Sequence, residues 1–595
     1  MLLFFCLGMS LTDERLNSEL VKRFDCEYKI GDSYLIEIQE LGVQNKKWCK
    51  AISTVLYVKS DYTVLACEKK VLMFFENDSS HSSFRVGDRY TLNTDLIPIK
   101  NKNNPGEFDS EFFYKSKGID KIGFVAKGAF IPKGNRISFF LKWSLRSRDY
   151  LGGILVNHLS GQELALAQAL ILGDRSFLDP ETTKDFGNSG AMHVLAVSGL
   201  HIGIILQIIL FFLKLFSRFF SKGKALIIAL VLIWIYTFIS GSSASVLRST
   251  FMFSVLAVSQ LKGKSYNPIN SLFFTGFVLL LLNPFFLFDI GFQLSFLAMI
   301  GIFLFYRPIS KWIYFRNKWI RKVWEGSAVG IAAQFVTVPL TLFYFHQFPN
   351  YFMMTNIGLM FSTGLILGLG MFVFSFYWLK YVGKIAVFLL SIVLYLTLDF
   401  VAFIDDLPGS VATGFQLHWI LVLCSFLLII CIYIFRTSAQ GLKILLYCFC
   451  FTFVGYSVFQ RFESMTKSEI CFYNDSKTLF SVKYQDAIFC FYDREEDEVD
   501  KVKFALNSYT KIYPGNISYL SLRSKDWKIR MKDMFVHVKR KKNGFRIFFN
   551  KHRYFVKNRN SSFQTDTGVI CLPWITTCLK SEINLKEGAV RFSLE

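Results

Sequence analysis

The chain has 595 residues, of which 52% are hydrophobic and 17% aromatic, and its mean hydropathy is +0.36. This composition excludes an ordinary soluble protein, because several apolar runs reach the roughly 18–25 residues that span a bilayer. The formal net charge of +22 favours an anionic partner, either lipid head groups or nucleic acid. Positive loops that only set the membrane topology would explain part of this surplus.

The first part of the chain is expected to be mainly β structure. Residues 1–26 open with MLLFFCLGMSL, which is too short to span, and we interpret them as an apolar anchor remnant and linker. Residues 27–135 contain runs such as YLIEIQEL and AISTVLYVK, which are rich in β-branched and aromatic residues. About five such strands in about 100 residues predict a small OB-like barrel.

Residues 136–190 are expected to contain amphipathic and re-entrant helices. The run 136–160, RISFFLKWSLRSRDYLGGILVNHLS, is basic and amphipathic and suits a membrane surface. The run 162–178, QELALAQALILGDRSFL, has Asp174 and Arg175 near its end. It is too short to span, so it is predicted to be interfacial or re-entrant.

Residues 191–459 predict a polytopic α-helical membrane domain with about ten transmembrane or re-entrant helices. The expected spans are about 192–216, 225–240, 243–261, 268–283, 289–306, 326–345, 353–378, 382–404, 417–436 and 441–459. Every second loop is rich in Lys and Arg, whereas the alternate loops 241–243, 284–288, 346–352 and 405–416 contain neither. The positive-inside rule makes the basic loops cytoplasmic, so both terminal domains are expected outside the cytoplasm.

Residues 460–595 predict a basic extracytoplasmic domain that is α+β or mainly β. The stretch 537–559, HVKRKKNGFRIFFNKHRYFVKNR, interleaves basic and aromatic residues, as suits a phosphate backbone and stacked bases. A solvated hairpin face is the alternative and stays open. The DNA-contact candidates are Lys539, Arg540, Lys541, Lys542, Arg546 and Arg553.

The stretch GAMHVLAVSGLHIG, residues 190–203, places polar residues at the start of an apolar run. On one continuous helix His193, Ser198 and His201 would share a face, and Gly199 and Gly203 would form a G-x-x-x-G pair that lets another helix approach. Intramembrane polar groups normally face the bundle interior or a wet cavity. Two alternatives stay open: glycines that break the helix, and histidines that only bond to neighbouring helices.

Three further polar residues stand in apolar spans and complete the channel or DNA-path candidates. Arg248 follows GSSASVL, and Asp289 and Gln293 are one helical turn apart in DIGFQLSF. Because an intramembrane Arg usually pairs with an acid or faces water, Arg248 with Asp289 is a candidate pair. A polar lining of this kind suits the passage of an anionic polymer.

No motif for an ATP motor or a hydrolytic metal centre is visible. KGKS at 262–265 lacks the earlier glycine of a phosphate loop, since position 258 is Val258. We therefore expect no catalytic residue, metal or cofactor, and a protein that is not an enzyme. Ser198 with His201 or His193 resembles a nucleophile–base pair, but an i, i+3 pair on one helix has poor geometry. An intramembrane serine hydrolase and a transporter of small anionic or polar solutes remain the alternatives.

Several stretches together resemble one family, the ComEC competence proteins. They are NNPGEFDSEFFYKSKGI (103–119), ALAQALILGDRSFLDPETTKDFGNSGAMHVLAVSGLHIG (165–203), SGSSASVLRSTFM (240–252), NPFFLFDIGFQLSFLAMIGI (283–302) and AAQFVTVPLTLFYFHQFP (332–349). Their order and spacing agree with the family over about residues 27–435, and HVLAVSGLHIG is the most specific of them. The metallo-β-lactamase-like C-terminal domain that the family often adds is not recognisable in the tail.

The resemblance implies a channel in the bacterial inner membrane that moves single-stranded DNA into the cytoplasm during natural transformation. It also implies an outer DNA-receptor protein, a cytoplasmic helicase-like ATPase and membrane lipid as partners. Because the tail lacks the histidine and aspartate ligands of the family's C-terminal domain, a separate nuclease would be needed. A homo-oligomer is also an open expectation.

Overall fold

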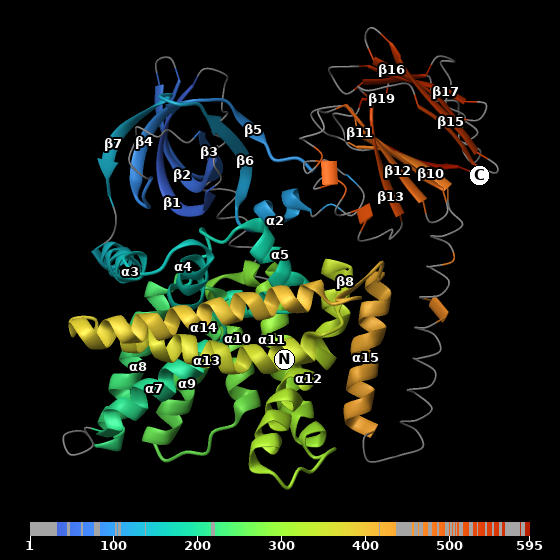
Figure 1. Ribbon diagram of the computed structural model, residues 1–595. Helices are drawn as coiled ribbons and strands as arrows, with labels where there is room; N and C mark the ends of the chain where they lie inside the picture. The colour runs from blue at the N-terminus through green and yellow to red at the C-terminus, as the bar shows by residue number, and fades with distance from the viewer. Residues whose placement is uncertain are drawn as a thin grey trace, which may run out of the picture. The chain divides into compact units, whose positions relative to one another are not determined.

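The computed structural model describes residues 32–435 with short gaps, and discontinuous segments between 455 and 594 (Figure 1). The gaps in the first range are at 45–47, 61–62, 77–83, five positions within 102–108, 137–138, 216–220 and 416. The chain divides into two compact units. One contains the N-terminal strands and most of the helices, and the other contains the helix Trp419–Phe435 and the C-terminal strands.

The N-terminal strands form one seven-stranded sheet with the order β5-β6-β3-β2-β1-β4-β7. The strands are β1 (Ser33–Gln44), β2 (Trp48–Ser60), β3 (Thr63–Glu76), β4 (Asp88–Asn93), β5 (Leu96–Pro98), β6 (Ile119–Val125) and β7 (Phe130–Asn135), and α2 (Ser110–Ser116) precedes β6. The first three strands form an antiparallel meander, β1 also pairs with β4, and β3 pairs with β6 in parallel. This sheet lies within the predicted range 27–135.

The two-residue alternation of β1 separates a core face from a polar face. Tyr34, Ile36 and Ile38 are buried, whereas Glu37 and Gln39 lie on the other side of the strand. Burial, together with the charges of Asp32 and Asp95, raises the pKa of Tyr34 to about 12.

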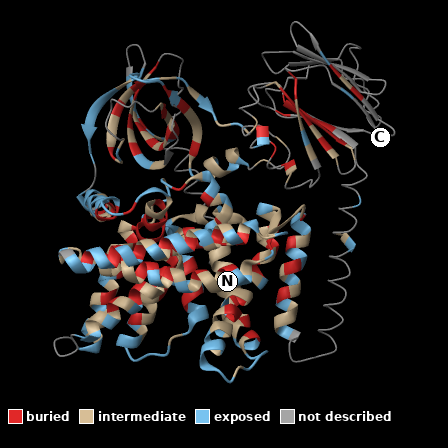
Figure 2. Cartoon of the chain, viewed as in Figure 1, coloured by how far each residue is buried: buried red, intermediate tan, exposed pale blue. Residues whose placement is uncertain are grey.

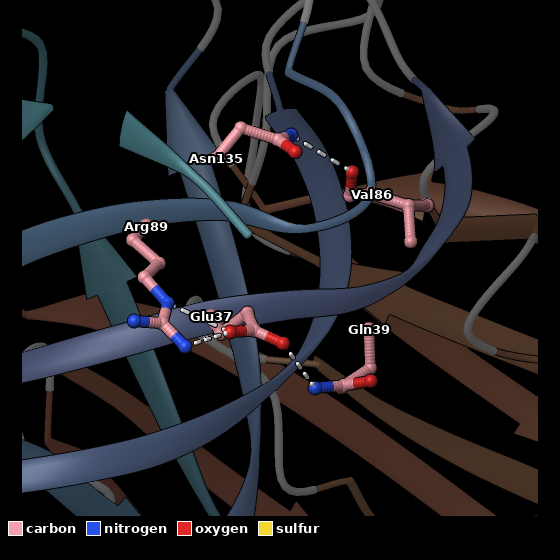
Figure 3. A network of polar contacts seen from close by, with 5 residues as sticks. All are labelled: Glu37, Gln39, Val86, Arg89 and Asn135. Atoms are coloured by element: carbon pink, nitrogen blue, oxygen red, sulfur yellow. Dashed lines mark hydrogen bonds and ion pairs between the residues drawn. The ribbon is translucent and has the colours of Figure 1, made fainter. Parts of the chain in front are cut away.

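The polar face of β1 is joined to β4 by a cross-strand ion pair. Arg89 donates from Nε to Glu37 Oε2 at 2.8 Å and from Nη2 to the same oxygen at 2.7 Å (Figure 3). Glu37 Oε1 accepts from Gln39 Nε2 at 3.1 Å, and Asn135 Nδ2 donates to the carbonyl of Val86 at 3.3 Å. Because Glu37 and Arg89 are direct partners in the β1–β4 register, the pair stabilises that register.

Four helical elements follow the sheet in the described part of the chain. They are α3 (Phe139–Val156), α4 (Gly161–Ala167), the π-helix η1 (Gln168–Leu172) and α5 (Pro180–Asn188). The exposed face of α3 carries Phe139, Trp143 and Tyr150, which fits the amphipathic surface helix expected there. The short apolar helix ends at Leu172 rather than near 178, because Gly173 adopts φ +77° and ends it.

Nine further helices of the described residues correspond to the first nine expected spans. They are α7 (Gly199–Leu215), α8 (Lys222–Ile239), α9 (Ala244–Leu261), α10 (Pro268–Leu282), α11 (Ile290–Ser310), α12 (Lys318–Phe345), α13 (Phe352–Phe376), α14 (Lys380–Asp406) and α15 (Trp419–Phe435), with the four-residue α6 (Met192–Leu195) before α7 and the 3-10 helix η2 (Pro284–Phe288) before α11. Two short strands, β8 (Gln347–Pro349) and β9 (Val411–Thr413), pair with each other.

Among the described residues, six helices are long and apolar enough to cross a membrane: α8, α9 and α11 to α14. Three shorter apolar helices coincide with α7, α10 and α15. The expected span 441–459 lies almost wholly outside the described residues, so the count of ten stays a prediction. The chain is a polytopic membrane protein.

Short polar side chains define where several of these helices begin. Asn267 caps α10 by accepting from the backbone N–H of Ile269 at 3.0 Å, and Pro268 occupies the first helical position. Asp289 caps α11 in the same way, accepting from the N–H of Phe292 at 2.7 Å.

The C-terminal strands form two sheets. The first has the order β13-β12-β11-β10-β20, with β10 (Ser468–Phe472), β11 (Leu479–Tyr484), β12 (Ala487–Tyr492), β13 (Asn516–Ser521) and β20 (Val590–Leu594). The second has the order β14-β15-β16-β17-β18-β19, with β14 (Trp527–Met531), β15 (Met534–Lys541), β16 (Gly544–Phe549), β17 (His552–Lys557), β18 (Ser562–Thr565) and β19 (Ile583–Asn584). The described part of the tail is thus mainly β.

Candidate polar site in the membrane domain

The stretch 190–203 is not one helix. The helix α6 ends at Leu195, Ala196 is extended with φ −83° and ψ 127°, and α7 begins only at Gly199. His193 therefore lies on α6, where its Nδ1 is 3.1 Å from the Gly190 carbonyl oxygen. The prediction that His193 shares a helix face with Ser198 and His201 is wrong, because that face was calculated for an unbroken helix.

Gly199 and Gly203 both face α9. A Cβ atom on Gly199 would lie 2.6 Å from Ser249 Oγ and 3.2 Å from Arg248 Nη2, and one on Gly203 would lie 3.5 Å from the Phe253 ring. A side chain at 199 would thus displace Ser249 or Arg248. These short distances are of the kind that a G-x-x-x-G pair permits between neighbouring helices.

His201 binds the turn that precedes α7. Its Nδ1 accepts from the backbone N–H of Ser198 at 3.2 Å and lies 2.8 Å from Ser198 Oγ. Since Nδ1 accepts, the neutral ring carries its proton on Nε2. This side chain is 1% exposed, and Nε2 has no hydrogen-bond partner within the described part of the chain. The Ser198–His201 contact is therefore a helix-start contact that leaves a buried donor unused.

Arg248 is the buried cation of the site. It is 4% exposed, donates from Nη1 to the carbonyl of Ser295 on α11, and lies 5.7 Å from the centre of the Phe296 ring. Its Nε has no partner among the described residues. Burying a guanidinium without a carboxylate is costly, so this placement is unusual for a residue that serves packing alone.

The expected pair of Arg248 with Asp289 is absent from the ion pairs of the described residues. Asp289 lies just before α11 and is used as its N-cap. Gln293 donates from Nε2 to the carbonyl of Leu287 at 2.7 Å, which joins η2 to the first turn of α11. Asp289 therefore precedes the span as its N-cap, and Gln293 lies in the first turn of α11.

Asp174 and Arg175 follow the π-helix in a loop. Asp174 Oδ1 accepts from the N–H of Ser176 at 3.0 Å and from its hydroxyl at 2.6 Å, which forms a local turn. Arg175 is exposed. The buried part of this region is η1 itself (Figure 2), whose Ile171 carbonyl accepts from Tyr236 of α8 at 3.0 Å. π-Helices are frequent at functional sites.

The sequence reasoning missed a line of hydroxyl contacts across α8, α9 and α11. Thr237 and Thr250 are 2.7 Å apart between α8 and α9, and Ser245 donates to Ser295 Oγ at 3.2 Å between α9 and α11. Ser249 donates back to the carbonyl of Ser245 at 3.0 Å. The available signal was the i, i+4 spacing of Ser245 and Ser249 in an apolar run. Together with Ser198, His201 and Arg248 these residues form what we call the polar seam.

The DNA-contact candidates of the tail fall on one sheet, except one. Lys539, Arg540 and Lys541 lie on β15, Arg546 on β16 and Arg553 on β17. Lys542 lies outside the described residues. No group of three or more His, Cys, Asp or Glu that could hold a metal ion occurs within the described part of the chain.

The six long apolar helices and the buried polar seam define a multi-pass membrane protein. Residues 170–438 match the family described as Competence protein. The chain is 31% identical over 183 residues to ComE operon protein 3 of Bacillus subtilis and 28% identical over 214 residues to Recombination protein 2 of Haemophilus influenzae. These alignments cover 31% and 35% of this chain, and 22% and 26% of the two relatives. The segment 170–438 thus carries the similarity to competence proteins.

An uncharacterized protein of Aquifex aeolicus is 30% identical over 212 residues, which is 32% of this chain and 50% of that protein. The chain thus matches half or less of the length of each of these relatives. No solved structure matches.

Proposed function

We propose that the protein takes up DNA in competence by moving a single strand across the bacterial cytoplasmic membrane along the polar seam. The observation that carries the proposal is Arg248, a buried guanidinium with no carboxylate partner among the described residues, inside the segment that matches the competence family. A polyanion that passes this point would supply the negative charge that the fold does not.

The electrostatics of the helix ends support the same reading. Gly199 is the first residue of α7, Ser245 is the second of α9, and Ser295 is in the second turn of α11. The contacts among these residues and Arg248 bring the N-terminal ends of three helices together. Because each N-terminus carries a partial positive charge, their convergence favours an anion. By the positive-inside rule this end faces the outside, where DNA arrives.

The N-terminal sheet supports an OB-like domain on that outer side. Its pairing of β1 with β2 and β4, and of β3 with a late parallel strand, suits a small, partly open barrel. In this proposal the C-terminal domain is also extracytoplasmic, and an outer DNA receptor and a cytoplasmic helicase-like ATPase act as partners. The proposed role requires no chemical step by this chain, and strand degradation falls to a separate nuclease.

A transporter of small anions is the second candidate, and Arg248 favours it equally. The test is the import of labelled DNA into the cytoplasm of cells with and without this gene. The proposal expects protected cytoplasmic single strands that vanish on deletion, while DNA still binds at the cell surface. Unchanged import would refute the proposal and favour a transporter of small anions.

The serine hydrolase alternative is tested by Ser198→Ala. The backbone N–H of Ser198 still reaches His201 Nδ1 in this variant, so the turn before α7 is kept. We expect import within about fivefold of wild type, since one partly exposed hydroxyl contact contributes only about 1 kcal/mol. Loss of import as complete as after gene deletion would favour a nucleophilic role for Ser198.

A further inference from the structure

The helix α14 has one buried face and one exposed apolar face (Figure 2). It packs against α13, α4 and α5, and Leu390, Leu394 and Val401 are buried. From residue 388 to residue 403 the exposed positions recur at intervals that keep them on the opposite side of the helix. We call this set the α14 stripe. It consists of Phe388, Leu389, Ile392, Tyr395, Leu396, Asp399 and Phe403.

One member of the α14 stripe is charged. Asp399 is the sole charged residue of the sequence between Lys384 and Asp405, and its side chain is exposed. About 10 Å of helix separate it from Asp406, the last residue of α14. The carboxylate thus lies within the apolar length of the helix rather than at its end.

The other polar side chains near Asp399 on α14 are hydrogen-bonded. Thr397 donates to the carbonyl of Val393 at 2.6 Å, and Ser391 donates to Glu163 of α4 at 2.8 Å. The Asp399 carboxylate has no hydrogen bond or ion pair with any described residue. If lipid tails alone covered the stripe, this carboxylate would have neither water nor a donor, which is costly.

A second copy of the chain would not supply the missing countercharge. In a two-fold dimer the same surface faces itself, so Asp399 would approach Asp399 of the other copy. Two like charges at close range disfavour each other, and the α14 stripe contains no Lys, Arg or His. The cation therefore has to come from a different protein.

We propose that the α14 stripe is the docking surface for a transmembrane helix of another protein, which carries a Lys or Arg at the level of Asp399. The apolar members of the stripe pack against that helix, and its cation donates to the carboxylate. Ionisable residues in membranes commonly pair with one another, and such a charge pair selects one partner over others. This inference goes beyond the proposed DNA transport, because α14 contributes no residue to the polar seam.

The test uses the full-length protein in cells, with photoreactive benzoylphenylalanine in place of Leu396. Illumination should give a covalent product heavier than the chain. Mass spectrometry should identify in it a protein with a basic residue in a transmembrane helix. Asp399→Leu is expected to lower the yield at least about tenfold, because breaking a desolvated charge pair is costly. Asp399→Glu keeps the carboxylate and should keep the product.

Reversing both charges makes the test specific. Asp399→Lys should abolish the product, and changing the basic residue of the identified protein to Asp should restore it. The matched control places the same photoreactive residue at Val231, an exposed position of α8, which contains no acidic residue. This position is expected to give no such product.

Thermal unfolding of the purified protein in detergent separates a structural role of Asp399 from a docking role. Asp399→Leu should unfold at the same temperature as wild type or above it, because it removes a charge from an apolar surface. A lower midpoint would mean that the chain itself holds the carboxylate, and would overturn the proposal.

Three cross-linking results would also overturn it. A product that contains two copies of this chain would make the stripe a self-association surface. No protein product from position 396 would mean that lipid covers the stripe. An equal yield from Asp399→Leu would mean that the charge does not select the partner. None of these results bears on the proposed transport, since DNA import is measured separately against gene deletion.

Discussion

At the scale of single residues, the proposed transport of DNA depends mainly on Arg248. Its buried guanidinium donates to the Ser295 carbonyl and lies near the Phe296 ring, and no carboxylate pairs with it among the described residues. Such a group costs folding free energy, because charge is taken from water without full compensation. A residue that opposes stability is retained in a fold when it serves function, which is the physical reason for placing it on the transport path.

Arg248→Met tests this reasoning directly. Methionine fills much of the same volume without charge, so we expect a thermal unfolding midpoint equal to or above that of wild type. DNA import is expected to fall at least about tenfold, the equivalent of about 1.4 kcal/mol in binding or barrier height. A lower midpoint would mean that the guanidinium contributes net stability. Its retention would then need no functional explanation.

Two substitutions of His201 separate its two ring nitrogens. His201→Asn places an oxygen near the Nδ1 position and keeps an acceptor for the Ser198 N–H, but it leaves nothing at Nε2. His201→Gln places a polar atom near Nε2 instead. If the Nε2 proton contacts the passing DNA strand, the Asn variant loses import about tenfold. Its free energy of unfolding stays within about 1 kcal/mol of that of wild type. Normal import in the Asn variant would restrict His201 to capping α7.

The sequence indicated most of these residues but not their partners. Ser198 and His201 do meet, because they are three positions apart at the start of α7. His193 does not join them, since the chain is extended at Ala196. Asp289 was expected beside Arg248, yet an Asp directly before an apolar helix is also a good N-cap, and that local interaction prevails.

At the scale of elements, α7 and α9 form the contact on which the site depends. Gly199→Leu would force a side chain into Ser249 Oγ and Arg248 Nη2, so we expect import to fall to the level of gene deletion. The matched control is Gly364→Leu on α13, where an added Cβ meets no atom within 4 Å. It is expected to import normally, and protein levels in membranes are compared by immunoblot. Equal effects of the two variants would show that helix glycines, not this contact, matter.

The packing of α5 predicts a pH effect on stability. Burial, and then the charges of Asp405 and Glu181, raise the pKa of Asp185 above its ordinary value. A raised pKa in the folded state means that the proton is lost more easily on unfolding. The contribution to stability is therefore complete below about pH 3.9 and is lost as pH rises through the folded-state value.

Asp185→Asn should accordingly raise the unfolding midpoint at neutral pH, and its advantage should shrink as the pH falls toward about 4. The measurement is thermal unfolding of the wild type and the variant across this range. Asp179→Asn is the matched control on the same helix, because Asn also caps a helix start. If the unfolding midpoint of Asp185→Asn at neutral pH were below that of wild type, the repulsion of Asp185 by Asp405 and Glu181 would be contradicted.

The sequence predicted elements better than their ends. The apolar runs located α7 to α15, because bilayer length is a strong constraint on composition. It could not locate the break between α6 and α7, since Val197, Ser198 and Gly199 are compatible with both a helix and a turn. The π-helix η1 was also beyond prediction. It depends on Tyr236 of α8 reaching the Ile171 carbonyl and on Gly173 lying against Ser240, which are tertiary contacts.

At the scale of the whole molecule, the charge of the loops predicts which domains lie outside. Lys127→Cys, on the exposed N-terminal domain, should react with a membrane-impermeant maleimide in intact spheroplasts. Lys318→Cys, at the start of α12 in a basic loop, should react only after permeabilisation. Labelling of the wild-type chain by the same maleimide is subtracted as background. Its native Cys49 and Cys67 are buried. The reverse pattern would invert the orientation and place the entry end of the seam in the cytoplasm.

The C-terminal domain shows what a sequence pattern leaves open at this scale. The alternation of basic and aromatic residues in 537–559 predicted strands and an anionic partner. It did not show which residues share a face, because a shift of one residue between strands would exchange the two faces. The observed register pairs Lys539 with Arg546 and Arg540 with Phe545.

The central claim is that a single DNA strand crosses the membrane along the polar seam beside Arg248. The most direct measurement is the amount of labelled single-stranded DNA protected in the cytoplasm of cells that carry Arg248→Met, against wild type and the Gly364→Leu control. The account predicts import reduced at least about tenfold, with normal protein in the membrane and normal DNA binding at the surface. Import equal to wild type would contradict it, because a strand that passes the seam would meet this guanidinium.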